Sequence, residues 1–320
     1  DLGGTWYWNR YPGARCDSES HSYCYSFSDE LMREWEWSEK YPGPPEILRY
    51  LNHVADRFDL KRDIRFDTRV AAAHYDEAAN LWRVTTDTGD ALTAQFLITA
   101  VGCLSTANVP DIPGLDTFRG RWYHTGHWPH EGVDFAGKRV GQIGTGSTGI
   151  QTAPVIAETA ARLTVFQRTA NYSVPARNGP LTPEFKRWIR DNVAEIRTTM
   201  QAAVNGHPFL LDERSALDVP PVQREAIYQK AWQTGGLRFR ATFRDLVTSN
   251  EANATAVEFL KRKIREIVRD PATAAKLADI DHPYAAKRRP IDTGYFETFN
   301  RDNVDLVDVR ADPIERVTAD

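Results

Sequence analysis

Residues 138–149 read Lys-Arg-Val-Gly-Gln-Ile-Gly-Thr-Gly-Ser-Thr-Gly, an apolar strand pattern that leads into the turn Gly144-x-Gly146-x-x-Gly149. A helix is expected next, followed by a second strand over 163–167. The three glycines of such a turn allow a tight bend, close approach of the backbone to a pyrophosphate, and close packing of helix on strand. The free N–H groups at the helix N-terminus bind the anion. The pattern predicts a βαβ dinucleotide-binding unit.

The end of the second strand predicts which nucleotide is preferred. An NAD site carries Asp or Glu there to accept from the ribose 2′-hydroxyl, whereas this chain has Gln167-Arg168-Thr169. The guanidinium of Arg168 suits a 2′-phosphate and Thr169 adds a hydroxyl, so we expect NADPH rather than NADH. The alternative is that Arg168 is a solvated surface arginine.

Fifteen residues before the glycine turn, residues 118–129 read Phe-Arg-Gly-Arg-Trp-Tyr-His-Thr-Gly-His-Trp-Pro. Two further blocks stand out: residues 3–17, rich in Gly and aromatic residues, and residues 286–303, which begin Ala-Lys-Arg. Together with the glycine turn, these blocks resemble the type I Baeyer–Villiger monooxygenases, FAD- and NADPH-dependent enzymes, and most closely the phenylacetone and cyclohexanone monooxygenases. The resemblance runs from Asp1 to Asp320.

The resemblance implies an α/β fold of the two-dinucleotide-binding-domain flavoproteins, with a Rossmann-like NADP domain, an incomplete FAD domain and a helical insert. The chain opens at Asp1 directly into Leu-Gly-Gly-Thr-Trp, so we expect a central fragment without the N-terminal βα unit of the FAD domain. The expected parts are 1–104 (FAD domain), 105–174 and 284–320 (NADP domain) and 175–283 (insert).

The resemblance also assigns site residues. Those expected to line FAD are Thr5, Trp6, Trp8, Asp17, Tyr23 and Val70. Those expected to contact NADPH are Arg15, Cys16, Gly144, Thr145, Gly146, Ser147, Thr148, Gly149, Ile150, Gln151, Arg168, Thr169, Lys287 and Arg288, together with Asp17. Arg288 is the expected catalytic arginine, and Asp17 its orienting carboxylate.

In the implied reaction, NADPH reduces the flavin, O₂ adds to give a peroxyflavin, and one oxygen atom is inserted next to a ketone carbonyl to form an ester or lactone. A guanidinium is charged at any working pH, so Arg288 can stabilise an anionic oxidant without protonating it. The alternative roles are plainer: Arg288 beside Lys287 could bind a nucleotide phosphate, and Asp17 could cap a helix.

Three other functions compete with this interpretation. An N- or S-oxygenating flavin monooxygenase uses the same nucleotide folds, although the Trp128-Pro129 ending argues against it. A flavin disulfide reductase needs a closely spaced cysteine pair, which Cys16 and Cys24 do not provide. An NADP-binding module without catalysis is the third, since fold alone does not imply activity.

Composition limits the partners. With 41% apolar and 26% charged residues the chain is an ordinary globular protein, and a net charge of -4 gives no reason to expect nucleic acid or an anionic membrane. We expect a small-molecule ketone and O₂ as partners and no obligate protein partner. The three cysteines lack metal or redox-pair spacing, we assign no metal, and a cytoplasmic location is favoured.

Periodicity predicts the remaining elements. Residues 1–30 read as ordered loop, and His124 as a hydrogen-bonded hinge with packing residues around it. Pro154 should bend its helix or occupy an early turn. Helices are expected over 44–58 and, starting at a Thr182 cap, through two apolar stripes to about residue 279. Strands are expected over 64–70, 82–86, 92–96, 96–101, 304–309 and 314–317.

Overall fold

The computed structural model describes residues 1–320, and its central element is a parallel sheet of order β4-β5-β8. Helix α4 (Ser147–Thr159) connects the first two strands, so the predicted βαβ unit is present. The strand predicted over 304–309 is also present and pairs with β5. The three strands are β4 (Arg139–Ile143), β5 (Arg162–Gln167) and β8 (Val304–Asp308).

Close packing holds α4 against the turn that precedes it. A Cβ atom added to Gly149 would lie 2.3 Å from the carbonyl oxygen of Gly144, so only glycine fits there. Pro154 lies in the middle of α4 rather than in an early turn, and the helix continues through it. The ring costs the helix one backbone hydrogen bond without ending it.

One large core joins the parallel sheet to the helices that follow it. Thirty-three buried residues from α4, β5 and β8 and from the helical region form a single cluster, so these helices share the hydrophobic core of the nucleotide-binding sheet. Leu260 and Ile264, from the predicted stripe, are buried within it. The helices are α7 (Pro221–Thr234), α8 (Asn250–Ile267), α9 (Pro271–Ala278) and α10 (Tyr295–Thr298).

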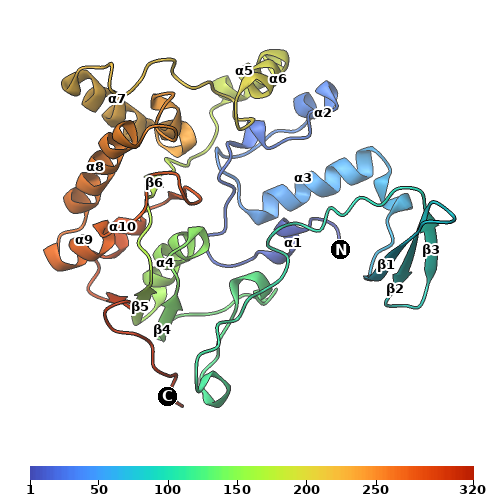
Figure 1. Cartoon of the computed structure of the whole chain (residues 1–320), viewed down its shortest axis with the longest axis horizontal. Coiled ribbons are helices and arrows are strands. Elements are labelled where there is room, and N and C mark those ends of the chain that lie inside the picture. Colours follow the sequence, from blue (N-terminus) through green and yellow to red (C-terminus); the bar gives the residue numbers. More distant parts are fainter.

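A second group of helices, α2 (Asp29–Glu34), α5 (Pro183–Asp191) and α6 (Val193–Ala202), gathers at the top of Figure 1. The Thr182 hydroxyl accepts the N–H of Phe185 at 3.2 Å, which is the predicted helix cap. The apolar stripe predicted from Phe185 onward is divided between α5 and α6 at Asn192, and its buried members pack on Met32 of α2.

The N-terminal third contains a small sheet that stands apart in Figure 1, at the right. Its strands β1 (Val70–Asp76), β2 (Leu81–Thr86) and β3 (Ala91–Ala94) are antiparallel. Helix α3 (Pro44–Arg57) confirms the prediction over 44–58. The prediction of pure loop over 1–30 is wrong, since α1 (Thr5–Trp8), η1 (Ser20–Ser22) and the start of α2 lie there.

Three predicted strands are wrong. Residues 64–70 follow the 3-10 helix η2 (Leu60–Asp63), and the strand starts only at Val70. Residues 96–101, predicted as a buried strand, are mostly exposed and are not assigned as strand, and residues 314–317 are not assigned as strand either. The reason is shared: an apolar run forms a strand only where a partner strand offers backbone hydrogen bonds, and none pairs with these segments.

Short elements complete the chain. The parallel pair β6 (Val174–Pro175) and β7 (Ile291–Asp292) joins two distant segments next to the nucleotide-binding unit. None of the helices has both the length and the apolar composition needed to cross a bilayer. The remaining 3-10 helices are η3 (Leu115–Thr117), η4 (Thr125–His127) and η5 (Gly236–Thr242).

The contrast between two glycines of the turn is testable. Gly149→Ala should lower the free energy of unfolding by about 1–3 kcal/mol, because the added methyl meets a backbone carbonyl that cannot move away. Gly146→Ala should change the free energy of unfolding by no more than about 0.5 kcal/mol, because no atom lies within 4 Å of the added Cβ. Alanine caps a helix less well than glycine, but it also makes the unfolded chain less flexible, and these two effects offset each other. Urea unfolding measures both. Equal losses in the two variants would contradict this packing.

Candidate active site

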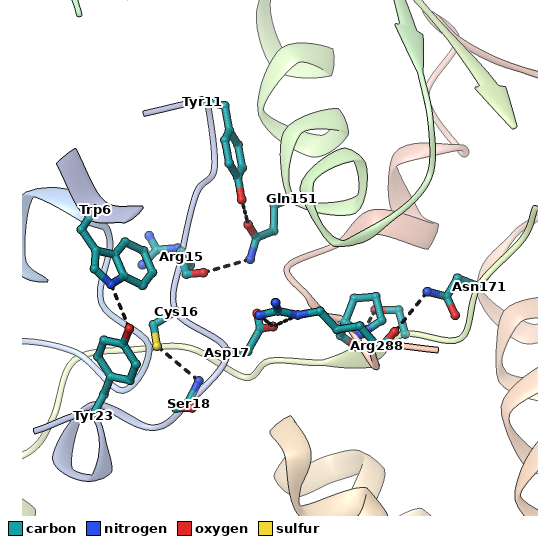
Figure 2. A network of polar contacts seen from close by, with 12 residues as sticks. Trp6, Tyr11, Arg15, Cys16, Asp17, Ser18, Tyr23, Gln151, Asn171 and Arg288 are labelled. Carbon is teal, nitrogen blue, oxygen red and sulfur yellow. Dashed lines mark hydrogen bonds and ion pairs between the residues drawn. The ribbon is translucent and has the colours of Figure 1, made fainter. Parts of the chain in front are cut away.

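An ion pair between Asp17 and Arg288 joins the two ends of the chain. Asp17 lies between α1 and η1, and Arg288 lies between α9 and β7. The Asp17 Oδ2 atom accepts from Arg288 Nη2 at 2.6 Å and from Nε at 3.0 Å (Figure 2). The Asp17 side chain is only 11% exposed, whereas that of Arg288 is 65% exposed. One side of the guanidinium is therefore held and the other remains accessible.

The charges of the pair respond differently to this environment. Burial raises the pKa of the Asp17 carboxyl, and the neighbouring Arg288 guanidinium lowers it by less, so the net pKa is above its ordinary value. Burial alone lowers the pKa of Arg288. The charge and hydrogen bonds of Asp17, with smaller effects from Tyr11 and Cys16, together raise it by more than burial lowers it, so the net pKa is above its ordinary value. Arg288 is thus a fixed cation.

The backbone around Arg288 is held by residues that sequence reasoning did not single out. Asn171 donates its Nδ2 to the Arg288 carbonyl at 3.3 Å. Asp292, buried in β7, accepts the N–H groups of Gly294 and Tyr295, each at 3.1 Å, and also bonds the Ser173 hydroxyl. The Asp-Thr-Gly sequence at 292–294 is a turn signal that could have identified this anchor.

A second set of contacts brings Asp17 to the glycine turn. The side chain of Gln151 in α4 accepts from the Tyr11 hydroxyl at 2.8 Å and donates to the Arg15 carbonyl at 3.2 Å (Figure 2). A Cβ atom on Gly13 would lie 2.2 Å from the Gln151 carbonyl oxygen, so the N-terminal segment packs directly on the helix. Tyr11 was not among the predicted site residues.

Two of the residues predicted to contact nucleotide also make contacts within the protein. Arg15 Nη1 donates to Glu39 Oε1 at 2.7 Å and to the Tyr41 carbonyl at 2.9 Å. Cys16 is buried, and burial raises the pKa of its thiol to about 12. Both residues support the segment that carries Asp17.

The glycine turn has the shape that a dinucleotide needs. Gly144 has a positive φ of 106°, and added Cβ atoms on Gly144 and Gly146 would meet open space. The Thr145 hydroxyl donates to the Thr169 carbonyl at 2.8 Å, which ties the turn to the end of β5. Ser147, Thr148 and Ile150 follow in the first turn of α4. Arg168 and Lys287 are exposed, form no ion pair within the protein and are available to an anionic ligand.

The residues predicted on the flavin side are mostly together. Trp6 Nε1 donates to the Tyr23 hydroxyl at 3.0 Å, and Figure 2 shows both rings beside Cys16. Trp8 is exposed in the same helix α1, which begins at Thr5. Val70 is separate from this group, because it begins β1 of the outlying sheet.

In the segment over 118–129 only one residue is buried. Trp128 is buried, as a packing residue should be, with its ring 5.5 Å from that of Tyr123. His124 Nδ1 accepts the N–H of Gly126 at 3.0 Å, which caps η4. The next residue after the motif, His130, meets the ring of Tyr7 edge-on at 5.2 Å. No group of three or more potential metal ligands occurs in the structure.

The unequal burial of Asp17 and Arg288 leads to a stability prediction. Arg288→Ala should lower the free energy of unfolding by about 1–3 kcal/mol at neutral pH, because it leaves a buried carboxylate without its partner. Asp17→Asn should cost less than about 1 kcal/mol, because the exposed guanidinium is solvated instead.

The pH dependence has a definite sign. The folded pKa of Asp17 is already above the unfolded value in wild type, and in Arg288→Ala it rises further. The loss of stability relative to wild type should therefore grow as pH increases from the folded pKa in wild type to the higher folded pKa in the variant, and stay constant above it. Chemical denaturation at several pH values measures this. A larger loss in Asp17→Asn than in Arg288→Ala would contradict the account.

The chain matches a family model described as pyridine nucleotide-disulphide oxidoreductase over residues 22–208. It is 50% identical to the cyclohexanone 1,2-monooxygenase of an Acinetobacter species, over 99% of this chain and 58% of that protein. It is 42% identical to phenazine N-monooxygenase PhzNO1 of Lysobacter antibioticus, over 99% of this chain and 59% of that protein.

A solved structure, the OTEMO complex with FAD and NADP, superposes with a TM-score of 0.95 at 45% identity, covering 100% of this chain and 61% of the other. The chain thus spans about 60% of the length of the relatives that it matches. The α/β flavoprotein fold expected from the sequence is confirmed. The chain belongs to the pyridine nucleotide-disulphide oxidoreductase family, and within it is similar in sequence and fold to the Baeyer–Villiger monooxygenases.

Proposed function

We propose that the protein is an NADPH-dependent Baeyer–Villiger monooxygenase that inserts one oxygen atom of O₂ beside a ketone carbonyl, giving an ester or lactone. The observation that carries the proposal is the Asp17–Arg288 pair, which presents a half-free guanidinium beside the segment that Gln151 fastens to α4. The similarity to cyclohexanone 1,2-monooxygenase supports the choice of a ketone.

The proposal assigns FAD and NADPH as cofactors. When bound, FAD accepts reducing equivalents from NADPH and activates O₂. The open space beside Gly144 and Gly146 fits a pyrophosphate, and Trp6, Trp8 and Tyr23 provide aromatic surface for a flavin. We assign NADPH to the residues of the turn, to Arg168 and Thr169, and to Lys287, with Thr5 and Val70 as further flavin contacts.

Arg288 supplies what this chemistry asks of the protein. During oxygen insertion, negative charge develops on oxygen in the transition state. A cation lowers the energy of that transition state most when the cation is already in position and does not have to rearrange. The guanidinium is already oriented by two hydrogen bonds to Asp17. Since it does not lose its proton at any working pH, it stabilises the charge without transferring a proton.

Asp17 acts through Arg288 as a positioning residue. Its carboxylate occupies Nε and Nη2, which leaves Nη1 of the guanidinium to face the reacting groups. Because it is nearly buried and held in a segment fastened to α4, it fixes the arginine relative to the glycine turn. Loss of Asp17 should therefore loosen the arginine rather than remove a reactant.

N-oxygenation is the second candidate, favoured by the similarity to phenazine N-monooxygenase PhzNO1. Disulfide reduction is disfavoured. Cys16 and Cys24 are both free, burial raises the pKa of the Cys24 thiol to about 11, and its sulfur accepts from Trp37 Nε1 at 3.1 Å. Neither thiol has the low pKa and exposure of a reactive cysteine.

The wider organisation follows from the same proposal. We assign residues 1–104 to the FAD domain, 105–174 and 284–320 to the NADP domain and 175–283 to the insert. We also propose a ketone and O₂ as the partners, with no obligate protein partner, nucleic acid or membrane. The free cysteines support a cytoplasmic location.

The nucleotide preference is tested at the end of β5. Arg168→Asp should weaken NADPH binding by roughly 10–100-fold and improve NADH binding, because it replaces a phosphate ligand with an acceptor for the 2′-hydroxyl. Steady-state KM values for both nucleotides measure this, with Arg187→Asp on the exposed face of α5 as the control. An unchanged preference for NADPH would defeat the assignment.

The catalytic role is tested at Arg288. Arg288→Ala should still consume NADPH in the FAD-loaded enzyme, yet form ester about 10²–10³-fold more slowly, because the developing oxyanion loses its fixed cation. Product analysis with cyclohexanone and with phenazine distinguishes ketone oxidation from oxidation at an aromatic ring nitrogen. Undiminished ester formation would refute the role of Arg288, and N-oxide as the only wild-type product would favour the second candidate.

A further inference from the structure

The side-chain amide of Gln142 holds the two ends of the glycine turn together. Gln142 lies in β4, two residues before Gly144. Its Nε2 atom donates to the Gly144 carbonyl at 3.2 Å and to the Gly149 carbonyl at 3.1 Å. Both neighbours are carbonyl oxygens, which only accept, so the amide nitrogen is the end of the side chain that faces them. A strand residue therefore joins the start of the turn to the first turn of α4.

The bond to Gly144 orients the peptide group between Gly144 and Thr145. In a planar trans peptide, the C=O and the N–H point in opposite directions. A Gly144 carbonyl that points toward Gln142 therefore directs the Thr145 N–H away from it. This N–H has no acceptor within the protein. The backbone beside it is open, since Cβ atoms added to Gly144 and Gly146 would meet no atom within 4 Å.

No backbone hydrogen bond fixes this peptide. The bonds between the backbones of β4 and β5 end at the Gly144 N–H, which donates to the Phe166 carbonyl at 3.0 Å. Gly144 has a φ of 106°, in a region where glycine meets little steric restriction. The bond from the Thr145 hydroxyl to the Thr169 carbonyl holds a side chain rather than the peptide before it. Gln142 is thus the contact that sets the direction of the Thr145 N–H.

The other end of the Gln142 amide carries a cost. Its Oε1 atom is buried and has no hydrogen-bond partner. A buried acceptor without a partner destabilises the folded protein, and an apolar side chain in β4 would avoid this cost. Local costs of this kind are expected where a residue serves function rather than stability. The two bonds from Nε2 are what the glutamine adds at this position.

We propose that Gln142 is a positioning residue for the nucleotide, which presents the Thr145 N–H to the pyrophosphate of NADP(H). Backbone N–H groups at the start of a helix are the ligands that such a turn offers to a phosphate. A donor that is already oriented binds more tightly, because binding does not have to order it. The inference rests on the proposed nucleotide site and does not depend on the proposed oxygenation.

The first test compares two ligands of the whole protein by titration calorimetry. Gln142→Met keeps the length of the side chain and removes both donors. It should weaken NADP⁺ binding about 5–10-fold, but weaken binding of 2′-AMP, which has no pyrophosphate, by less than about 2-fold. Gln233→Met, at an exposed position of α7, is the control and should change neither dissociation constant. A general loosening of the domain would instead weaken both ligands.

Gln142→Glu provides a second test through its pH profile. A carboxylate cannot donate to the two carbonyls, whereas the neutral acid donates one proton. Burial next to carbonyl oxygens favours the neutral acid, so the NADP⁺ affinity of this variant relative to wild type should rise as pH falls from about 8 to about 6. The comparison with wild type cancels the titration of the nucleotide's own phosphate.

The outcomes separate the role of Gln142 from the nucleotide site itself. Undiminished NADP⁺ binding in Gln142→Met, or equal losses for NADP⁺ and 2′-AMP, would overturn the role of Gln142 and leave the site in place. A wild-type protein that does not bind NADP⁺ would overturn both. Should Gln142→Met fail to fold, the pH profile of Gln142→Glu decides, and a loss of affinity that does not vary with pH would overturn the proposal.

Discussion

The rest of the site depends on one ion pair between residues 271 positions apart. Asp17 is nearly buried and Arg288 is largely exposed, so the carboxylate is held by the fold and the guanidinium is held by the carboxylate. A buried carboxylate is costly unless a cation is close, and this cost keeps the arginine beside it. The accessible side of a fixed cation is what oxyanion chemistry requires.

Two independent supports bring the pair to the glycine turn. On one side, Gln151 in α4 fastens the segment around Tyr11 and Arg15 to the helix whose N-terminus forms the turn. On the other side, the β6–β7 pair and the buried Asp292 hold the backbone just after Arg288. The nucleotide-binding unit thus serves as the rigid frame for both members of the pair, although neither belongs to its sheet.

Local sequence signals predicted the elements whose stabilising contacts lie close together in the sequence. The βαβ unit, α3 and the Thr182 cap follow from periodicity and short-range chemistry, and all are present. The apolar run over 96–101 misled the prediction, because a strand also needs a partner that no local signal reveals. Similarly, the resemblance placed Asp17 and Arg288 together, but Tyr11 and Asn171 emerged only from contacts across the chain.

At Arg288 one carboxylate balances the guanidinium and leaves one side of it free. The most direct test of the central claim is a crystal structure of the protein with FAD and NADP bound. The account predicts that Arg288 keeps its bonds to Asp17 and points its free nitrogen toward the flavin and nicotinamide. A guanidinium that has left Asp17 to bind the 2′-phosphate beside Lys287 would contradict it.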